Sequence, residues 1–143
     1  MNTPDLAKLG QPGEPGLILY DGVCVLCSNW FRFVAARDVS RKFYFTAIQS
    51  PYGRTLAQQL GIDPESPQTN AVLLDGKINL RSDSAIAALS ALPRWGWVAA
   101  FRLMPKPLRD ALYTLIARNR YALFGKHDVC DLGGQRYADR IVS

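Results

Sequence analysis

Two cysteines three positions apart, Cys24 and Cys27, stand where a short apolar run gives way to a stretch with helical spacing. Residues 17–20 have the pattern of a buried strand, and Asp21-Gly22 ends it. Apolar residues then recur at helical spacing as far as residue 37, which predicts a helix that begins near Cys24. We therefore expect both sulfur atoms in the first turn of that helix.

This expected position of the two thiols has chemical consequences. The first N–H groups of a helix lack intrahelical partners and the helix dipole is positive there, which favours a thiolate over a thiol. Such settings lower the pKa of a thiol from about 8.5, and we expect Cys24 to be the more acidic of the pair. The i, i+3 spacing also matches the Cα separation of about 4.4–6.8 Å that a disulfide requires. The pattern thus predicts a pair that can form and break a disulfide reversibly.

Asp21 lies just before the two cysteines, and the sequence leaves its role open. A carboxylate near the thiols opposes thiolate formation by like charge, yet it can also take or deliver a proton during exchange. Alternatively, Asp21 only makes the turn, which is an ordinary function of an Asp-Gly pair.

The segment Asp21-Gly-x-Cys24-x-x-Cys27 after an apolar strand resembles the signature of the DCC family of thiol-disulfide oxidoreductases, named for that aspartate and those two cysteines. Further similarity lies in Ser82-Asp83-Ser84-Ala85, in residues 113–121 and in the late Cys130, so the resemblance spans roughly residues 17–132. It implies a thioredoxin-like fold and a redox function, and we take Cys24, Cys27 and Asp21 as the candidate catalytic residues.

One position departs from the usual thioredoxin-like pattern. Proteins of that fold usually place a cis-proline just before the third strand, facing the cysteine pair, where the neighbouring backbone binds an extended substrate. Here the equivalent place holds Thr69-Asn70, and the nearest proline is Pro67. We therefore expect the contact with peptide substrates to be remodelled.

The remaining pattern predicts an α/β fold: a thioredoxin-like sheet with flanking helices and a C-terminal helical extension. Residues 1–15 read as a loose, flexible lead-in, residues 16–143 as one domain, and residues 93–143 as a mainly helical extension of it. The expected elements are a strand over 42–48 parallel to the first, a helix over 51–60 capped by Ser50, a hairpin over 71–80 that turns at Asp75-Gly76, and a helix capped by Ser82 or Ser84 that runs to residue 92.

In the C-terminal extension, a long apolar helix pattern follows Pro107, with Arg109, Arg118 and Arg120 interleaved. The interpretation that we favour packs the apolar stripe on the sheet and turns the arginines to water, because stripes of this kind usually belong to a core. The alternative is a basic amphipathic surface that contacts a membrane or an acidic partner.

His127 and Cys130 support a competing hypothesis. Together with Cys24 and Cys27 they supply one nitrogen and three sulfur atoms, a donor set that suits a structural, tetrahedral zinc ion. Because a first-turn cysteine pair already has a redox explanation, we assign no metal. Cys130 is otherwise either a further redox thiol or a buried, inert cysteine.

Length and composition narrow the functional class. A chain of 143 residues can bury a core without disulfide staples, and three cysteines do not form a disulfide scaffold. With no bilayer-spanning apolar run and no signal-peptide pattern, we expect a cytoplasmic protein. The net charge of +5 is mild, and no motif points to nucleic acid.

No phosphate-cradling glycine loop is present, so we expect no bound organic cofactor. The sequence predicts a thiol-disulfide oxidoreductase whose partners are a substrate containing a disulfide or a dithiol and a thiol reductant. The alternative from another class is a non-enzymatic module that uses the cysteine pair only as a redox sensor.

Overall fold

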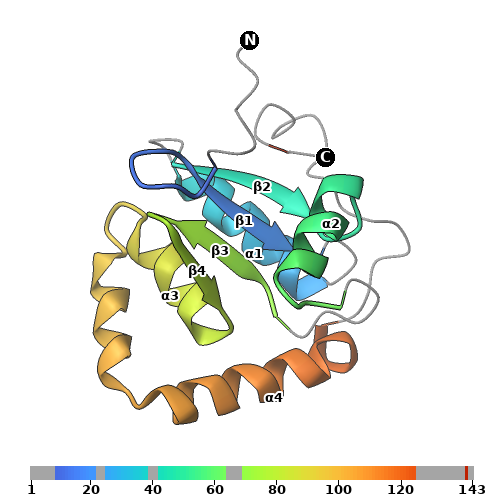
Figure 1. The fold of residues 1–143 in the computed structure, drawn as a ribbon. Coiled ribbons are helices and arrows are strands. Elements are labelled where there is room, and N and C mark those ends of the chain that lie inside the picture. The colour runs from blue at the N-terminus through green and yellow to red at the C-terminus, as the bar shows by residue number, and fades with distance from the viewer. Residues whose placement is uncertain (1–8, 22–24, 39–41, 64–68, 125–140, 142–143) are drawn as a thin grey trace.

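The computed structural model describes residues 9–21, 25–38, 42–63, 69–124 and 141; the side chains of residues 25–28, 120, 121, 123 and 124 lie outside this description. Figure 1 shows a sheet with helices on both faces and a long helix beside it. The elements in chain order are β1 (Gly16–Tyr20), α1 (Val25–Arg37), β2 (Phe43–Ala47), α2 (Pro51–Gln59), β3 (Ala71–Leu74), β4 (Lys77–Leu80), α3 (Ser82–Ser90), the 3-10 helix η1 (Gly96–Leu103) and α4 (Lys106–Phe124).

β1 is a central strand of the four-stranded sheet, whose order is β2-β1-β3-β4. It pairs in parallel with β2 and antiparallel with β3, so that Ile18 lies between Phe45 and Val72. All five residues of β1 are buried. The sequence of a strand that is covered on both faces is a continuous apolar run. Residues 17–20 accordingly carry no polar group in their side chains apart from a tyrosine hydroxyl.

The two faces of β1 pack against different helices. Ile18 and Tyr20 belong to a core with Phe31 of α1 and Ala88 of α3, so α1 and α3 cover one face. Leu19 packs with residues that include Ala57 of α2 on the other face. This mixed sheet with helices on both faces is a thioredoxin-like α/β fold, as the sequence predicted.

Several local predictions are confirmed. The pairing of β1 with β2 is parallel, and the hairpin of β3 and β4 turns at Asp75-Gly76, where φ is 52° and 76°, the left-handed values that this type of turn needs. Ser50 caps α2 by accepting a hydrogen bond from the Gly53 N–H at 3.1 Å.

The predicted cap of α3 is wrong. Ser82 is already the first helical residue, and Arg81, with φ of 54°, occupies the N-cap position without a side-chain cap bond. The two serine hydroxyls are engaged elsewhere: Ser82 donates to a carboxylate of α4, and Ser84 donates back to the Arg81 carbonyl at 2.6 Å. A long-range partner thus replaced the local cap.

Both ends of the described chain contact the sheet. Within the predicted lead-in, residues 9–15 form a turn in which Gly10 N–H donates to the Pro15 carbonyl at 2.7 Å, and Leu9 is buried against Leu17. At the other end, Ile141 forms a parallel bridge with Phe45 of β2. After α3, η1 and α4 supply a helical C-terminal segment, and α4 contacts α1 and α3.

The favoured interpretation of the apolar stripe on the long helix is wrong. Leu108, Leu112, Leu115 and Ile116 of α4 are between 48% and 60% exposed, so the stripe faces away from the core. Polar residues of α4, among them Arg109 and Asp110, instead face the start of α3.

Gly53 provides a test of how closely α2 packs on β2. A Cβ atom at this position would lie 1.9 Å from the Ala47 carbonyl oxygen, at the end of β2. A Gly→Ala change inside a helix normally stabilises the helix by about 1 kcal/mol. We expect Gly53→Ala instead to lower the free energy of unfolding by about 1–3 kcal/mol, because α2 must move off the strand.

Urea denaturation followed by circular dichroism measures this change. Gly96→Ala is the matched control, since a Cβ there meets no atom within 4 Å. Equal stability of the Gly53→Ala and Gly96→Ala variants would contradict the close packing.

Candidate functional site

The predicted site residues follow β1 in the sequence. Asp21 follows the last residue of the strand directly, and α1 begins at Val25, one residue after Cys24 in the sequence. Cys27 is the third residue of α1. The helix therefore begins where the sequence predicted, and the cysteines flank its start. Cys24 and the Cys27 side chain lie outside the described part of the structure, so their separation stays a prediction.

The Asp21 carboxylate is buried and held by a neighbouring strand end. Asp21 is only 1% exposed, and the Gln49 Nε2 amide donates a hydrogen bond of 2.7 Å to its Oδ1 atom. Gln49 comes just after β2, and the Ile48 N–H donates to the Tyr20 carbonyl at 2.8 Å. Parallel strands end at the same edge of a sheet, which is why the two side chains meet.

Aromatic packing fixes α1 relative to this strand end. The ring of Tyr20 stacks on Phe31 of α1 with a centroid separation of 4.6 Å and an interplanar angle of 6°. Phe31 in turn meets Phe45 of β2 edge-on at 4.8 Å. Because the three rings are fully buried, they fix the middle of α1 against the strand that ends next to Asp21.

Thr69 and Asn70 lie at the same edge, because Leu19 of β1 is opposite Ala71 of β3. The Thr69 hydroxyl is buried, accepts a hydrogen bond from the Arg81 N–H at 2.6 Å and donates to the Asn70 carbonyl at 2.7 Å. The Asn70 N–H donates to the Tyr113 hydroxyl at 3.2 Å. Backbone groups at the position that thioredoxin-like proteins usually present to substrate are therefore bonded within this chain, in part to a residue of α4.

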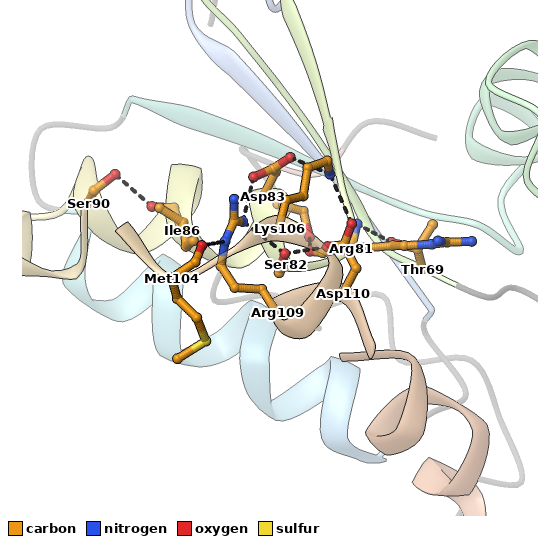
Figure 2. A network of polar contacts seen from close by, with 11 residues as sticks. Thr69, Arg81, Ser82, Asp83, Ile86, Ser90, Met104, Lys106, Arg109 and Asp110 are labelled. Carbon is orange, nitrogen blue, oxygen red and sulfur yellow. Dashed lines mark hydrogen bonds and ion pairs between the residues drawn. The ribbon is translucent and has the colours of Figure 1, made fainter. Parts of the chain in front are cut away.

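A network of ion pairs and hydrogen bonds joins α4 to the start of α3 (Figure 2). Arg109 Nη1 lies 2.8 Å from Asp83 Oδ1, and Lys106 Nζ lies 3.0 Å from Asp83 Oδ2 and 2.9 Å from Asp110 Oδ2. Ser82 closes the network with a short hydrogen bond to Asp110. The Ser82-Asp83 part of the family-like motif therefore serves to attach α4.

The network shifts the pKa of its charged groups. Partial burial opposes ionisation of Asp83, but hydrogen bonds from Arg109 and Lys106, together with their charges, hold its pKa below the ordinary value of 3.8. Burial likewise opposes ionisation of Asp110, and hydrogen bonds from Ser82 and Lys106 hold its pKa below 3.8. The Lys106 pKa rises above 10.5 because Asp110 and Asp83 accept its hydrogen bonds.

The structure does not describe the side chains of the predicted zinc ligands. His127, Cys130 and Cys24 all fall outside the described residues. Among the residues that the structure does describe, no three His, Cys, Asp or Glu side chains come together as metal ligands. The zinc hypothesis therefore stays a prediction.

One residue of this region, Gln49, escaped the sequence analysis. A usable signal existed for it, because it follows a strand predicted to be parallel to the one that Asp21 ends. Tyr113 is the first residue of the family-like segment 113–121, but its hydrogen bond with Asn70 could not be predicted from the sequence, because it depends on where α4 packs.

A thioredoxin-like domain whose first strand is followed in the sequence by Asp21-Gly22 and a Cys-x-x-Cys segment has the arrangement that is typical of thiol-disulfide oxidoreductases. Residues 18–126 match the model of the DCC1-like thiol-disulfide oxidoreductase family, and the chain belongs to that family. No solved structure shows significant similarity.

Two relatives extend the comparison. The uncharacterized protein YuxK of Bacillus subtilis is 35% identical over 117 residues, which cover 81% of this chain and 85% of the relative. A chloroplastic DCC family protein of Arabidopsis thaliana is 33% identical over 118 residues, which cover 81% of this chain and 69% of the relative.

The anchoring network predicts a defined pH dependence. A carboxyl group whose pKa is lower in the folded than in the unfolded chain contributes stability that is complete above the unfolded pKa and is lost as the pH falls through the folded pKa. For Asp83 and Asp110 this loss falls below pH 3.8. We expect the Asp83→Asn/Asp110→Asn double variant to be less stable than the wild type by about 1–3 kcal/mol at neutral pH, with a difference that shrinks in acid.

Urea denaturation at a series of pH values measures the difference, and amide hydrogen exchange of α4 shows whether this helix loosens first. Asp75→Asn, in the exposed hairpin turn, is the matched control. A difference between double variant and wild type that does not change with pH would contradict the assignment of the two carboxylates.

Proposed function

We propose that this protein catalyses thiol-disulfide exchange with Cys24 as the attacking thiol and Cys27 as the resolving thiol. Family membership supports the general activity. The observation that carries the assignment to these residues is the buried, hydrogen-bonded Asp21 carboxylate at the strand end from which the chain enters α1. A carboxylate next to the segment that carries both cysteines can take up or deliver a proton during exchange.

The reaction has two exchange steps. The Cys24 thiolate attacks one sulfur of a substrate disulfide, that S–S bond breaks, and the departing substrate thiolate takes up a proton. The Cys27 thiolate then attacks the Cys24 sulfur, which forms the internal Cys24–Cys27 disulfide and releases the second substrate thiol. The substrate gains two electrons that the cysteine pair loses, and a thiol reductant restores the dithiol. The same steps run in reverse for a dithiol substrate.

The start of α1 favours this chemistry. Unpaired N–H groups and the positive end of the helix dipole stabilise negative charge in the first turn, where the sequence places Cys27 and next to which it places Cys24. The packed rings of Tyr20, Phe31 and Phe45 hold the middle of α1 against the strand that leads into Asp21. The exchange needs no bound organic cofactor or metal.

The backbone before β3, where a general protein-disulfide reductase binds an extended peptide, is occupied differently in this chain. The Asn70 N–H is bonded to the Tyr113 hydroxyl, so an extended peptide that pairs with this backbone must first displace α4 contacts. We therefore propose that compact, low-molecular-weight disulfides or dithiols react faster than folded protein disulfides. A reducing compartment such as the cytoplasm supplies the thiol reductant that the cycle requires.

Cysteine variants test the exchange mechanism. We expect Cys24→Ser to reduce the rate of disulfide reduction to the uncatalysed level, because no attacking thiolate remains. Cys27→Ser should accumulate a mixed disulfide between Cys24 and the substrate, because the resolving thiol is missing. The measurements are reduction of a small aromatic disulfide and of insulin with dithiothreitol, and mass spectrometry of the trapped species.

Cys130→Ser is the matched control, and it should keep the wild-type rate. Wild-type protein without turnover on either substrate would contradict the proposed enzyme activity and would favour a redox sensor. One equivalent of zinc per chain, lost in Cys130→Ser, would favour the metal site instead.

The proposed role of Asp21 has its own test. We expect Asp21→Asn, which keeps the shape and removes the charge, to slow exchange on the order of 10²-fold, because the proton donor and acceptor is lost. A purely structural role would leave the rate unchanged, because asparagine keeps the shape of the side chain.

Gln49→Ala leaves the carboxylate in place without its amide donor, and we expect a smaller loss of rate than in Asp21→Asn. Rates of Cys24 alkylation by iodoacetamide separate an effect on the thiol from an effect on substrate. An Asp21→Asn variant with the wild-type rate would show that Asp21 only makes the turn.

A further inference from the structure

The apolar face of α4 points away from the protein. We use the term α4 apolar face for four residues that recur at positions i, i+4, i+7 and i+8 and therefore lie on one side of the helix: Leu108, Leu112, Leu115 and Ile116. Each is about half exposed, and Leu115 is 60% exposed. Contiguous apolar side chains on one side of a surface helix mark an interaction site.

Polar contacts on the opposite side hold the helix in this orientation. Arg109 has a side chain only 10% exposed and pairs with Asp83, Asp110 accepts from Ser82, and Tyr113 bonds to Asn70. Figure 2 shows these charged groups between α4 and α3. Turning the helix to bury the leucines would break all three contacts and leave Asp83, Ser82 and the Asn70 N–H without these partners. The outward apolar face is thus a built feature of the fold.

The exposed apolar surface continues onto η1. Trp97 is 60%, Phe101 47% and Leu103 89% exposed. Trp97 lies between Trp95 and Phe101, with ring centroids 5.7 and 6.1 Å apart. An open groove of about 390 Å³ with a mainly apolar lining runs between α3, η1 and α4 and includes Trp97, Phe101 and Leu112. We call the α4 apolar face and these three exposed residues of η1 the docking surface.

The docking surface lies in the most basic part of the chain. Residues 93–124 hold six Lys or Arg residues and one acidic residue, so they carry a net charge of +5, equal to that of the whole chain. The rest of the protein is therefore neutral overall. Arg102 is exposed next to Phe101 and Leu103, and Arg118 is exposed one turn from Leu115.

A second hollow, of about 540 Å³, brings one of these cations, Arg118, together with Arg81 of the preceding segment beside the apolar face. It is lined by Arg81 and Arg118 and by Leu115, with Asp110 also in the lining. An apolar surface flanked by guanidinium groups matches the boundary between lipid chains and anionic headgroups.

We propose that the docking surface binds the face of a membrane that contains anionic lipids. Tryptophan, phenylalanine and leucine on one side with arginines at the flank are typical of helices that lie in the plane of the interface. No helix within the described residues has the length and apolarity to cross a bilayer. A second copy of the chain is a poorer occupant, because it would bring the exposed Arg102 and Arg118 of one copy close to the same cations of the other.

Vesicle sedimentation with the full chain tests the proposal. We expect the protein to sediment with vesicles of phosphatidylcholine and phosphatidylglycerol at low salt, to be released as salt is raised, and to stay in solution with phosphatidylcholine alone. Tryptophan emission should shift to shorter wavelength on binding, and Trp97→Phe should remove most of that shift.

Two pairs of variants separate the docking surface from the rest of the surface. Leu115→Asp should weaken binding about tenfold or more, whereas Ile78→Asp should leave it unchanged, since Ile78 of β4 is also 60% exposed but lies outside the docking surface. Arg118→Glu should weaken binding to anionic vesicles, whereas Lys77→Glu on the exposed part of β4 should have little effect. Circular dichroism confirms that each variant is folded.

The outcomes are distinct. Absence of vesicle binding by the folded wild type, or equal losses in Leu115→Asp and Ile78→Asp, would overturn the proposal. A concentration-dependent dimer in sedimentation velocity that Leu115→Asp abolishes, without vesicle binding, would assign the surface to a second copy instead. Selective loss in Leu115→Asp and Arg118→Glu would support the membrane assignment.

Discussion

The pairing of β1 on both of its edges is the constraint on which the site depends. A strand that is parallel to β2 and antiparallel to β3 brings three chain segments to one end of the sheet: the residues after β1, the residues after β2 and the residues before β3. This register sets Gln49 beside Asp21 and places Asn70 at the same edge. Since every residue of β1 is buried, a shift in register would expose core side chains, and the positions of the site residues are fixed accordingly.

A second constraint sets the orientation of α4. Burying a large apolar side chain contributes about 1.5–3 kcal/mol, so turning four such residues inward would be worth several kcal/mol. The structure instead directs Arg109, Asp110 and Tyr113 inward, where charged hydrogen bonds join them to α3 and to the segment before β3. Removing one partner would leave a poorly solvated charge, which is strongly unfavourable. The outward apolar face is the consequence of that arrangement.

Most of the fold could be predicted from the sequence because its signals are local. The turn at Asp75-Gly76, the cap at Ser50 and the continuous apolar run of β1 each need only neighbouring residues for their interpretation. The predictions for α3 and α4 were wrong where a local rule met a long-range partner. Ser82 satisfies the requirements of a cap residue, yet its hydroxyl bonds to Asp110, 28 positions away.

The candidate site divides in the same way. The start of α1 at Val25 and the position of Asp21 follow from the pattern around the two cysteines. The burial of Asp21 depends on Gln49 and the packed rings, which no local pattern contains. The pairing of Cys24 with Cys27 stays a prediction of spacing and family resemblance.

α4 connects the end of the sheet near Asp21 with the docking surface, because it contacts each of them through a different side of the helix. Its inner side carries Tyr113, whose hydroxyl bonds to the Asn70 backbone at the edge of the sheet where Asp21 also lies. Its outer side carries Leu112 and Ile116 of the apolar face, one and three positions from Tyr113 in the sequence. A helix is stiff over this distance, so anything that displaces the outer side also acts on the hydrogen bond at Asn70. The attachment of α4 by Asp83 and Arg109 therefore determines both the direction in which the apolar face points and the state of the backbone next to the site.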